Sequence, residues 1–507
     1  MTIAEILKGL NVKRVTGPLE KEIEGIAYDS RIVKKGFLFV AIKGLSVDGH
    51  AFIKDVISKG AAGVVTEKAV DVQNEVAVIE VDDSRDALAL MSAAFYRDPS
   101  KKLSLIGITG TNGKTTTSYI TKNILEVWGK KVGLLGTVQY IVANKILPAS
   151  HTTPESLDLQ GYLREMVDNN IEYGVIEVSS HALALKRVKG CSFRVAVFTN
   201  FSQDHLDFHG TMEDYFAAKA MLFDYLGKDD YAVLNWDDPM VRSLAEKLNC
   251  HCITCGLERG AMLRAKNITD NRQQTTDNRL QTTDDRLQTT DNRQQWGLSF
   301  MIQTPEDEFL VRSELIGRNN IYNILMSAGA AYALGVSREA IIEGIRTVKP
   351  IEGRLEKIDA GQNFLCIVDY AHTEDALKKL IEEARLITGG KIITVFGCGG
   401  DRDRTKRPKM GVVASDLSDF VVITSDNPRI EEPSEIIKDI IKCIKKDNYI
   451  IEPDRAKAIE KAISIAKTGD TLLIAGKGHE NYQEIKGIRY PFSDKEVFKK
   501  IIQNAKW

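Results

Sequence analysis

One stretch, residues 103–120 (LSLIGITGTNGKTTTSYI), constrains the fold of this chain more than any other. An apolar run from Leu103 to Ile108 leads into a glycine-rich turn, and a helix-like pattern follows the turn. Backbone N–H groups in such a turn, with a helix dipole behind them, form a site for phosphate. The stretch therefore predicts a strand, an ATP-binding turn and the start of a helix.

The residue types of this turn fit nucleotide chemistry. Gly110 and Gly113 would let the backbone approach the anion. Lys114 would neutralise the outer phosphates, and the Thr115 hydroxyl would hold Mg²⁺. The spacing departs from the usual P-loop, because Ile108 stands where that pattern has its first glycine. The alternative is a plain strand–turn–helix corner, but a corner does not require Lys followed by Thr.

The composition excludes several classes of protein. The chain has 507 residues, 43% of them hydrophobic, and a length that fits about three domains. A formal net charge of −2 gives no field that would favour nucleic acid or a membrane surface. Seven scattered cysteines indicate a reducing compartment, and the start MTIAEILKGL fits an amphipathic helix rather than a signal peptide. No apolar run approaches the ~20 residues of a membrane span. We therefore expect a cytoplasmic protein.

The order of apolar and polar runs predicts an α/β protein of three domains. Residues 1–101 form a small N-terminal α/β domain. Residues 102–345 repeat a cycle of apolar strand, polar loop and helix, which predicts a P-loop ATPase-type domain with a parallel sheet covered on both faces. Residues 346–507 begin the cycle again as a Rossmann-like, doubly wound domain. Residues 98–100 are interpreted as a linker and residues 350–354 as a hinge.

A low-complexity segment at about 267–295 interrupts the central domain. From Asp270 to Gln295 the chain repeats units similar to TTDNRQQ, with aspartates seven residues apart. A seven-residue period is typical of coiled coils, but Leu280 and Leu287 are nearly the only apolar residues. Repetition and low hydrophobicity favour disorder. The flanking runs AMLRAKNI and WGLSFMIQ predict the two strands of a hairpin, with the repeat at its tip.

Polar side chains follow the predicted central strands at the edge where such sheets bind ligands. Glu177 ends the strand YGVIEV, and its carboxylate is a candidate ligand of Mg²⁺. The alternative, a cap for the next helix, suits Ser179 better. The following strand leads into SQDHLDFHG, where two histidines lie beside two carboxylates. A helix cap could explain Asp204 alone, so we interpret His205 as a second metal or phosphate contact.

Two further patterns in the central domain have ordinary explanations. Lys219 lies among small and apolar residues of a predicted helix, where lysine side chains usually reach toward solvent. Cys250, Cys252 and Cys255 resemble half of a zinc site, but a closed site needs a second pair, and the sequence offers none nearby. Neither pattern by itself predicts a functional site.

The third domain offers charges for a zwitterionic ligand. The run FGCGGDR could pass for a dinucleotide loop, but Arg402 stands where the third glycine should lie. Arg402 and Arg404 instead suggest an anionic ligand. The motifs DNPR (426–429) and GKGHE (476–480) are predicted to follow neighbouring strands. They supply a guanidinium for a carboxylate and a carboxylate for an ammonium. The alternative is surface ion pairs on loops.

Taken together, these motifs resemble those of the Mur ligases. The motifs that carry the resemblance, in the order seen in that family, are GTNGKTT, EVSSH, HLDFHG, GRNNIYN, DYAHT, GDRDRTKRP, DNPR and AGKGHE. The resemblance covers essentially the whole chain except residues 267–295. It is strongest to the members that add the third residue to the peptide of the cell-wall precursor. It implies an ATP-dependent amide ligase of peptidoglycan precursor synthesis.

The resemblance also assigns roles to individual residues. The implied ATP-binding residues are Gly110, Thr111, Asn112, Gly113, Lys114, Thr115, Thr116, Asn320 and Arg354. The implied contacts of a UDP-linked substrate are Ser30, Thr152, Thr153, Ser179 and Arg187. The implied contacts of the incoming amino acid are Arg402, Asp426, Asn427, Pro428, Arg429, Gly476 and Glu480. Two positions differ from the residues that Mur ligases often have. Leu185 stands where family members often have Gln, and Glu374 stands where they often have Pro.

The implied catalytic residues are Lys114, Glu177, His205 and Lys219. Mur ligases carbamylate a lysine at the position of Lys219 with CO₂, which turns a cation into an anion. The implied metal site for Mg²⁺ then consists of Thr115, Glu177, His205 and the Lys219 carbamate.

The implied reaction joins meso-diaminopimelate to the D-glutamate of UDP-N-acetylmuramoyl-L-alanyl-D-glutamate through an acyl phosphate. Arg429 resembles the diaminopimelate-adding enzymes, because its guanidinium can pair with a second carboxylate that lysine lacks. The expected partners are therefore small molecules, with no nucleic acid or membrane, and the chain is expected to act as a monomer.

Other functions stay open at this point. A folylpolyglutamate synthase would share the ATP loop but not DNPR or the YDSR sequence of the first domain. A P-loop switch acting on proteins would not need a zwitterion site. A non-enzymatic scaffold would not explain Lys114, Glu177 and His205 together.

Overall fold

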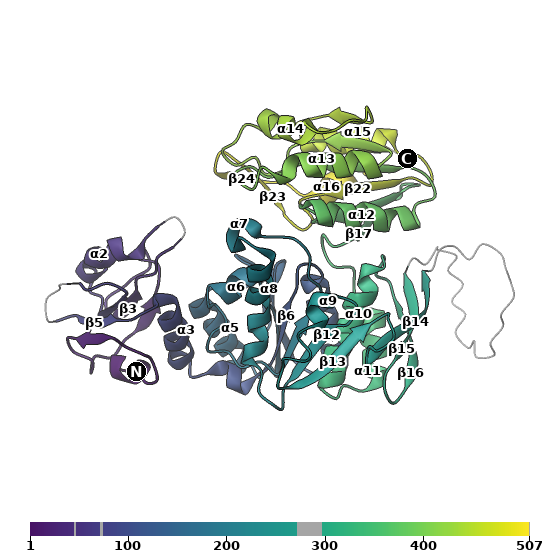
Figure 1. The fold of residues 1–507 in the computed structure, drawn as a ribbon. Coiled ribbons are helices and arrows are strands. Elements are labelled where there is room, and N and C mark those ends of the chain that lie inside the picture. Colours follow the sequence, from purple (N-terminus) through teal and green to yellow (C-terminus); the bar gives the residue numbers. More distant parts are fainter. Residues whose placement is uncertain (45–46, 71–74, 271–296, 506–507) are drawn as a thin grey trace.

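The computed structural model describes residues 1–44, 47–70, 75–270 and 297–505 of the chain. It contains three α/β bodies, each built around its own sheet, with the C-terminal body above the central one and the N-terminal body beside it (Figure 1). This confirms the predicted three-domain α/β fold. Most of the predicted repeat falls in residues 271–296, outside the described residues, so its interpretation stays a prediction.

The N-terminal sheet is small and mixed. Its strand order is β1 (Arg14–Thr16), β5 (Ala77–Glu80), β4 (Gly63–Thr66), β3 (Phe37–Val40) and β2 (Gly25–Ala27). The helices of this body are α1 (Ile3–Ile6), α2 (Ile53–Ser58) and α3 (Ser84–Phe95), with a 3₁₀ turn η1 (Gly49–Phe52). Helices α1 and α3 pack on one face of the sheet, and α2 packs on the other.

The central sheet carries the predicted nucleotide loop near its middle. Its strand order is β16 (Glu308–Ser313), β15 (Leu298–Gln303), β14 (Leu263–Asp270), β13 (His251–Gly256), β12 (Tyr231–Asn235), β11 (Val195–Phe198), β6 (Ser104–Thr109), β10 (Tyr173–Glu177), β7 (Val132–Leu135), β8 (Gln139–Val142) and β9 (Lys145–Pro148). Leu105, Ile106 and Ile108 of β6 are fully buried, because helices cover both faces. A strand buried on both sides needs such a continuous apolar run.

Helices cover the two faces of the central sheet. One face carries α4 (Lys114–Val127), α10 (Asn319–Ala333) and α11 (Arg338–Thr347). The other carries α5 (Ser156–Asp168), α6 (Ser180–Ala184), α9 (Pro239–Arg242) and the 3₁₀ turn η3 (Met221–Tyr225). Helices α7 (Leu206–His209) and α8 (Met212–Ala220) precede η3.

The prediction of a parallel central sheet is only partly right. From β13 to β7 the strands run parallel, but β8 and β9, and likewise β15 and β16, join antiparallel at the two edges. Short connections cause this, because a few residues can join only antiparallel neighbours. The predicted hairpin is confirmed, since β14 pairs antiparallel with β15. The expected linker at 98–100 belongs to a 3₁₀ turn, η2 (Pro99–Lys102), whose Pro99 and Ser100 are buried.

The C-terminal body is doubly wound, as predicted. Its strand order is β17 (Glu356–Ile358), β18 (Leu365–Asp369), β22 (Thr471–Ala475), β19 (Ile392–Phe396), β20 (Phe420–Ile423) and β21 (Tyr449–Ile451), with a separate hairpin of β23 (Tyr482–Ile485) and β24 (Ile488–Pro491). Helices α12 (Glu374–Ile387), α13 (Lys406–Leu417) and α14 (Pro433–Ile441) cover one face. Helices α15 (Arg455–Ile465) and α16 (Asp494–Ala505) cover the other.

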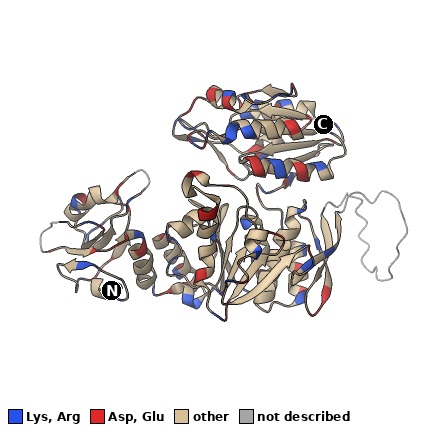
Figure 2. Ribbon diagram, viewed as in Figure 1, with Lys and Arg blue, Asp and Glu red and all other residues tan. Residues whose placement is uncertain are grey.

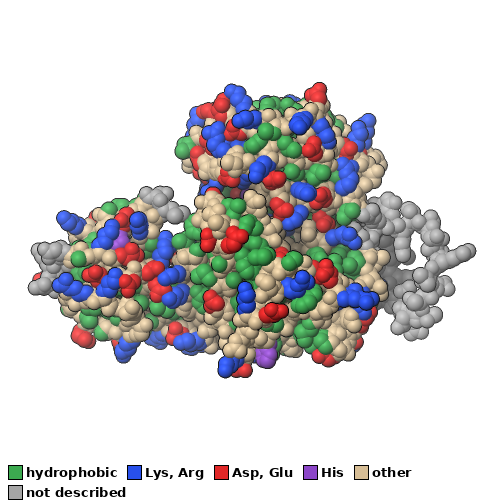
Figure 3. Space-filling model, viewed as in Figure 1, with side chains coloured by type: hydrophobic (Ala, Val, Ile, Leu, Met, Phe, Trp, Pro, Cys, Tyr) green, Lys and Arg blue, Asp and Glu red, His purple; other side chains and the backbone are tan. Residues whose placement is uncertain are grey.

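The surface has no dominant charge on the views shown. Basic and acidic residues alternate over all three bodies (Figure 2). In the space-filling view both signs are interspersed, and the outline is hollowed between the N-terminal and C-terminal bodies (Figure 3). Within the described residues, no helix combines the length and the apolar character that crossing a membrane requires.

Candidate functional site

The strand order brings the predicted central residues to one edge. Strand β6 lies between β10 and β11, and β7 lies beyond β10, all parallel. The loops that follow these four strands therefore emerge together. Gly110, Thr137 and Thr199 lie on these loops, and Glu177 is the last residue of β10.

The two glycines of the nucleotide loop serve packing within the protein. Gly110 has φ +143°, and a Cβ there would lie 1.9 Å from Thr199 Oγ1. Gly113 has φ +86°, and a Cβ there would lie 2.3 Å from Asn323 Oδ1. From the sequence, both glycines were predicted to let the backbone approach an anion. The structure adds a different reason, because both positions are closed to any side chain by neighbouring elements.

Hydrogen bonds fix the nucleotide loop to the end of β11. Asn112 N donates to Asn200 Oδ1 at 2.9 Å, and Asn200 Nδ2 returns a bond of 3.0 Å to the Asn112 carbonyl. Thr199 Oγ1 donates to the same carbonyl at 2.6 Å. The Lys114 ammonium folds back onto the carbonyls of Gly110 and Thr111, at 2.9 and 3.0 Å. Burial lowers the pKa of Lys114, while the charge of Glu177 opposes the shift.

Glu177 is a fully buried carboxylate held by hydroxyl and amide donors. Thr115 Oγ1 donates to Glu177 Oε2 at 2.9 Å. Thr137 donates its backbone N–H to Oε1 at 3.0 Å and its hydroxyl to Oε2 at 2.9 Å. The Gly136 position would put a Cβ 2.2 Å from Glu177 Oε1, so the chain must pass there without a side chain. The predicted pair Thr115 and Glu177 is thus brought together.

The donor set fits a hard cation such as Mg²⁺. A hydroxyl and a carboxylate oxygen stand next to the nucleotide loop, and both are oxygen ligands. No group of three or more His, Cys, Asp or Glu side chains in the described part of the chain is placed to hold a metal by itself. A Mg²⁺ ion here would therefore take most of its ligands from phosphate and water, as this cation usually does.

Lys219 does not reach toward solvent, which corrects the ordinary interpretation of its sequence pattern. Its side chain is buried, with 1% of the residue exposed, and Nζ donates to the Gly110 carbonyl at 2.8 Å. Nζ also lies 4.6 Å from the centre of the Tyr215 ring. Burial, followed by the charge of Lys114, lowers the pKa of Lys219 well below its usual value. The amine is thereby biased toward its neutral, nucleophilic form.

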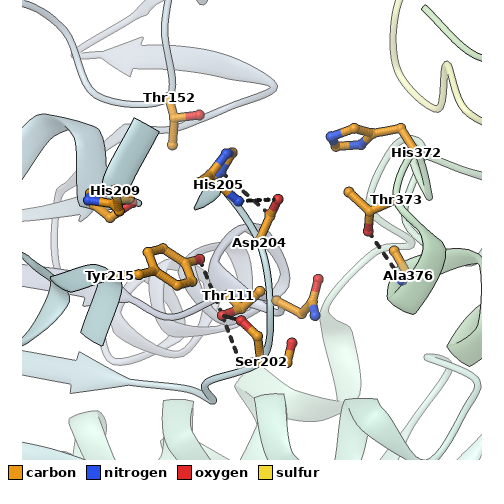
Figure 4. Close-up of polar contacts among 12 residues, drawn as sticks. Thr111, Thr152, Ser202, Asp204, His205, His209, Tyr215, His372, Thr373 and Ala376 are labelled. Carbon is orange, nitrogen blue, oxygen red and sulfur yellow. Dashed lines mark hydrogen bonds and ion pairs between the residues drawn. The ribbon is translucent and has the colours of Figure 1, made fainter. Parts of the chain in front are cut away.

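Three histidines lie close together near this site: His181 lies in α6, and His205 and His209 lie on the segment after β11. His205 has φ +51° and precedes α7, with Nε2 3.4 Å from Asp204 Oδ2. The His205 ring meets the ring of His181 at 4.7 Å, and His209 Nε2 lies 3.0 Å from Ser180 Oγ. In Figure 4, His205 and Asp204 point toward His372 of the C-terminal body. Burial lowers the pKa of His205.

The two residues predicted to assist ATP binding stand in different environments. Asn320 is buried and internally bonded: its amide donates to the Ile316 carbonyl at 2.7 Å and accepts from Asn323 at 2.8 Å. Arg354 lies over the Tyr370 ring and extends Nη2 to within 3.3 Å of Thr115 Oγ1. Arg354 thus reaches the nucleotide loop, whereas Asn320 supports the start of α10.

The predicted contacts of the UDP-linked substrate are not equally available. Thr153 is fully buried and donates to the Glu177 carbonyl at 2.7 Å, and Arg187 donates to the Thr153 carbonyl at 3.0 Å. Ser179 caps α6 by accepting from Ala182 N, which confirms the capping interpretation. Thr152 shares a hydroxyl contact of 3.1 Å with Thr137. Ser30, in the N-terminal body, has its carbonyl bonded by Lys59.

In the C-terminal body the two predicted amino-acid motifs flank one strand. They follow β20 and β22, and β19 lies between these strands, so the strands are not immediate neighbours. Asn427 Nδ2 donates to Glu480 Oε2 at 2.8 Å. The buried Lys477 donates to Asn427 Oδ1 and to Glu480 Oε2, both at 3.0 Å. Both bonds to Glu480 fall on one oxygen, and a carboxylate has further acceptor capacity for a ligand ammonium.

The remaining predicted residues surround this cluster. Asp426 accepts from Asn427 N at 2.7 Å, and a Cβ at Gly476 would lie 2.7 Å from Asp426 Oδ2. Arg429, at φ +54°, donates to the Gly400 carbonyl at 2.5 Å, which takes one of its five N–H donors. The Pro428 carbonyl accepts from Glu431 N.

The two arginines of the glycine-rich run separate in the structure. Arg402 is exposed on the loop after β19. The side chains of Arg402 and Arg429 both lie close to Gly399. Arg404 instead pairs with Asp439 at 2.9 Å. Its assignment to an anionic ligand was therefore wrong, because a carboxylate of the chain already occupies it.

Comparisons with known proteins cover the whole chain. The family model described as "Mur ligase middle domain" matches residues 108–331, "Mur ligase, glutamate ligase domain" matches 353–478, and "Mur ligase family, catalytic domain" matches 22–96. A UDP-N-acetylmuramoyl-L-alanyl-D-glutamate--2,6-diaminopimelate ligase of Bacillus licheniformis is 43% identical over 100% of both chains. The chain belongs to the Mur ligase family.

Other similar proteins bear the same description. A ligase of that name from Solibacter usitatus is 41% identical over 99% of this Mur ligase and 98% of its own length. A solved structure of a UDP-N-acetylmuramoyl-L-alanyl-D-glutamate--2,6-diaminopimelate ligase has a TM-score of 0.67 and 29% identity. It covers 100% of this chain and 99% of its own.

Two residues of this Mur ligase site, Thr137 and Asp375, were not predicted from the sequence. Thr137 contacts Glu177 and Thr152, and it could have been found as a polar residue just after β7. Asp375, at the start of α12, lies 3.4 Å from Asn112 Nδ2 and accepts from Ser202 Oγ at 3.1 Å. No sequence signal indicates the contacts of Asp375, because they join two bodies of the fold.

The last residues of the predicted hinge are bonded to the C-terminal body. Gly353 O accepts from Tyr370 N, and Leu355 N donates to Asp369 Oδ2 at 2.7 Å. A Cβ at Gly353 would lie 2.2 Å from His479 N. Gly353 and Arg354 thus contact the C-terminal body, and the hinge at 350–354 stays a prediction. Arg354 would travel with that body.

Proposed function

We propose that this Mur ligase is an ATP-dependent amide ligase that adds meso-diaminopimelate to the D-glutamate of UDP-N-acetylmuramoyl-L-alanyl-D-glutamate. The observation that carries the proposal is the 3.3 Å approach of Arg354, fixed to the C-terminal body, to Thr115 of the nucleotide loop. This contact joins the C-terminal body to the phosphate-type loop of the central body, which supports a site shared between the two bodies. The full-length similarity to ligases named for this reaction supports the same conclusion.

The first step transfers the γ-phosphoryl group of ATP to the side-chain carboxylate of D-glutamate. An acyl phosphate forms and ADP leaves. Gly110 to Thr116 hold the nucleotide, and Lys114 exchanges its two loop carbonyls for phosphate oxygens. Thr115 and Glu177 would hold Mg²⁺, whose charge would offset that of the phosphates. Little covalent chemistry falls to the chain, so positioning and charge neutralisation account for its contribution.

Lys219 is proposed to carry a carbamate formed from CO₂. Its neutral amine would attack CO₂ and lose one proton, which yields an anion. A buried amine with a strongly lowered pKa fits this reaction, because only the unprotonated form is nucleophilic. The resulting negative charge would lie beneath the loop, near Lys114, and would help to hold a cation together with His205.

The second step forms the amide. The neutral amino group of meso-diaminopimelate attacks the acyl carbon, phosphate leaves, and the nitrogen gives one proton to solvent while it keeps the other as the amide N–H. Glu480 and Asn427 would bind one ammonium of the amino acid. Arg429 and Arg402 would bind the carboxylate at the same end. Lysine has no carboxylate at that end, so it would offer the guanidinium no ligand carboxylate to bind.

The three domains divide this work. We assign UDP binding to residues 1–101, ATP binding to 102–345, and amino-acid binding to 346–507. Tyr28, which donates to Asp158 at 2.7 Å, links the first two of these bodies. A monomer supplies all of these residues. The seven cysteines of the chain are unpaired in the structure, which favours the reducing cytoplasm.

One assay tests the function. The purified chain is given ATP, Mg²⁺, the UDP-linked dipeptide and radiolabelled meso-diaminopimelate or lysine. Incorporation of diaminopimelate far above lysine, with phosphate release that needs both acceptor and amino acid, is expected. Phosphate release that needs neither substrate would instead favour the P-loop switch.

A further inference from the structure

Arg407 is a fully buried arginine directly behind the predicted amino-acid site. It lies in the first turn of α13 with 0% of its side chain exposed. Its guanidinium forms a two-bond pair with Glu431, at 2.7 and 2.9 Å, and a third bond of 2.9 Å to Asp439. A fourth, of 3.2 Å, reaches the Gly399 carbonyl. The pair with Arg407 lowers the pKa of the Glu431 carboxyl to about 2, so this carboxylate is ionised at any working pH.

Glu431 also binds the loop after β19, so it connects this loop to Arg407. Its Oε1 accepts from Asp401 N at 2.6 Å, while Asp401 Oδ2 accepts from Ile430 N at 3.2 Å. Gly400 N donates to the Asn427 carbonyl at 2.9 Å. These bonds join the Gly399–Arg402 loop to the 426–431 loop along their length.

The two joined loops hold strained backbone. Asp401 has φ +53° and Arg429 has φ +54°, a left-handed region that residues with side chains seldom adopt. A Cβ at Gly400 would lie 1.9 Å from the Pro428 carbonyl, so the loops are in the closest possible contact. Arg429 donates to the Gly400 carbonyl across the same junction. Such a conformation persists only where surrounding bonds enforce it.

A purely structural role does not account for this arrangement. Buried ion pairs contribute little net stability, because the cost of removing two charges from water consumes most of the attraction. A rigid junction has a clear use, however, since a guanidinium that selects between two similar ligands must be held within a fraction of an ångström.

We infer that Arg407 and Glu431 are positioning residues for the choice of amino acid, because they lock the two loops that carry Arg402 and Arg429. The inference rests on the proposed function for the identity of the amino acid. The locking itself is a property of the chain and can be measured without substrate. Neither side chain is expected to touch the ligand.

The variant Glu431→Gln tests the inference with the least disturbance. It keeps the shape of the side chain and leaves Arg407 bonded to Asp439 and Gly399. Arg407→Lys is the second variant, since an ammonium cannot reproduce the two-bond pair. Arg385→Gln is the matched control: it breaks the pair of Arg385 with Asp419 (2.8 Å) in the same body, where Asp419 binds Ile392 N at the start of β19.

We expect Glu431→Gln to raise the KM for meso-diaminopimelate about 10- to 100-fold, to leave the KM for ATP within about twofold, and to reduce the preference over lysine. Amide hydrogen exchange at Asp401, measured without substrate, is expected to accelerate in Glu431→Gln but not in Arg385→Gln. An unchanged KM for the amino acid in an active Glu431→Gln enzyme, or unchanged exchange at Asp401, would overturn the inference. If the unmodified chain fails to ligate diaminopimelate, the proposed function fails instead, and the exchange measurement still decides whether the loops are locked.

Discussion

The amine of Lys219 donates a 2.8 Å hydrogen bond to the carbonyl of Gly110, directly beneath the nucleotide loop. A lysine in this place is costly, because its pKa lies well below the usual value. Burial therefore disfavours the charged form of Lys219 in the folded protein. This cost indicates that the amine is retained for chemistry rather than for stability.

Lys219→Met is expected to abolish ligation and to stabilise the protein. A methionine removes the buried polar group without changing the shape greatly, so unfolding at pH 7 should cost about 1–2 kcal/mol more. Thermal unfolding and a ligation assay check both parts. For the carbamate, Lys219→Ala should recover part of its activity with a small added carboxylate. Full activity of Lys219→Ala without that addition would exclude the carbamate.

Glu177→Gln is expected to lower kcat about 10²- to 10³-fold and to raise the Mg²⁺ concentration that gives half-maximal rate. The change removes the negative charge that Thr115 and Thr137 hold in place. A titration of the rate with Mg²⁺ measures it. Glu172→Gln, which breaks only an exposed pair with Lys130, serves as the control. An identical Mg²⁺ dependence in both variants would remove Glu177 from the metal site.

Arg429→Ala is expected to raise the KM for meso-diaminopimelate about 100-fold or more while the KM for ATP stays near its original value. Steady-state kinetics with each substrate varied in turn gives both constants. Arg489→Ala is the matched control, because Arg489 approaches the same Glu484, at 3.8 Å, but lies outside the predicted site. Equal effects of Arg429→Ala on both substrates would refute the assignment.

His479 is expected to make the protein less stable in acid. Burial lowers the pKa of His479 from 6.5 to about 4. Between pH 6.5 and pH 4, His479 is therefore protonated in the unfolded chain but not in the folded one. Stability therefore falls as the pH drops from 6.5 toward 4, by up to about 2 kcal/mol at pH 5 for this group alone. His479→Gln should lose that part of the pH dependence. Melting temperatures of both proteins from pH 8 to pH 5 test this, and parallel curves would contradict it.

Replacing residues 271–296 by Asn-Gly is expected to leave kcat within about twofold. Asp270 and Leu298 are already opposite one another in the pair of β14 and β15, so a short turn can close the hairpin. This hairpin lies toward one edge of the central sheet, several strands from β6 (Figure 1). The ligation assay decides the matter, and a large loss of rate would show that the repeat has a function.

The sequence by itself determined the repeating α/β cycle, the nucleotide loop and the order of the polar motifs. These are local properties: an apolar run buried on both faces, a glycine-rich turn and a helix start are all readable from neighbouring residues. It also located Glu177, because a carboxylate at a strand end faces the loops of adjacent parallel strands. The antiparallel edges of the central sheet were not predicted from the sequence, because they depend on short connections rather than on the residue types of the strands.

Only the tertiary structure decided which polar groups meet. The pattern around Lys219 suggested a side chain that reaches toward solvent, and only the family resemblance marked this lysine as catalytic, because its neighbours in the helix give no sign of Gly110, which is distant in the chain. Arg404 appeared to be a ligand-binding group until Asp439 proved to be beside it. The place of Gly353 and Arg354 on the C-terminal body, and the contact of Arg354 with Thr115, likewise join segments far apart in sequence. Burial and pairing between such segments arise from packing, and spacing along the chain does not encode them.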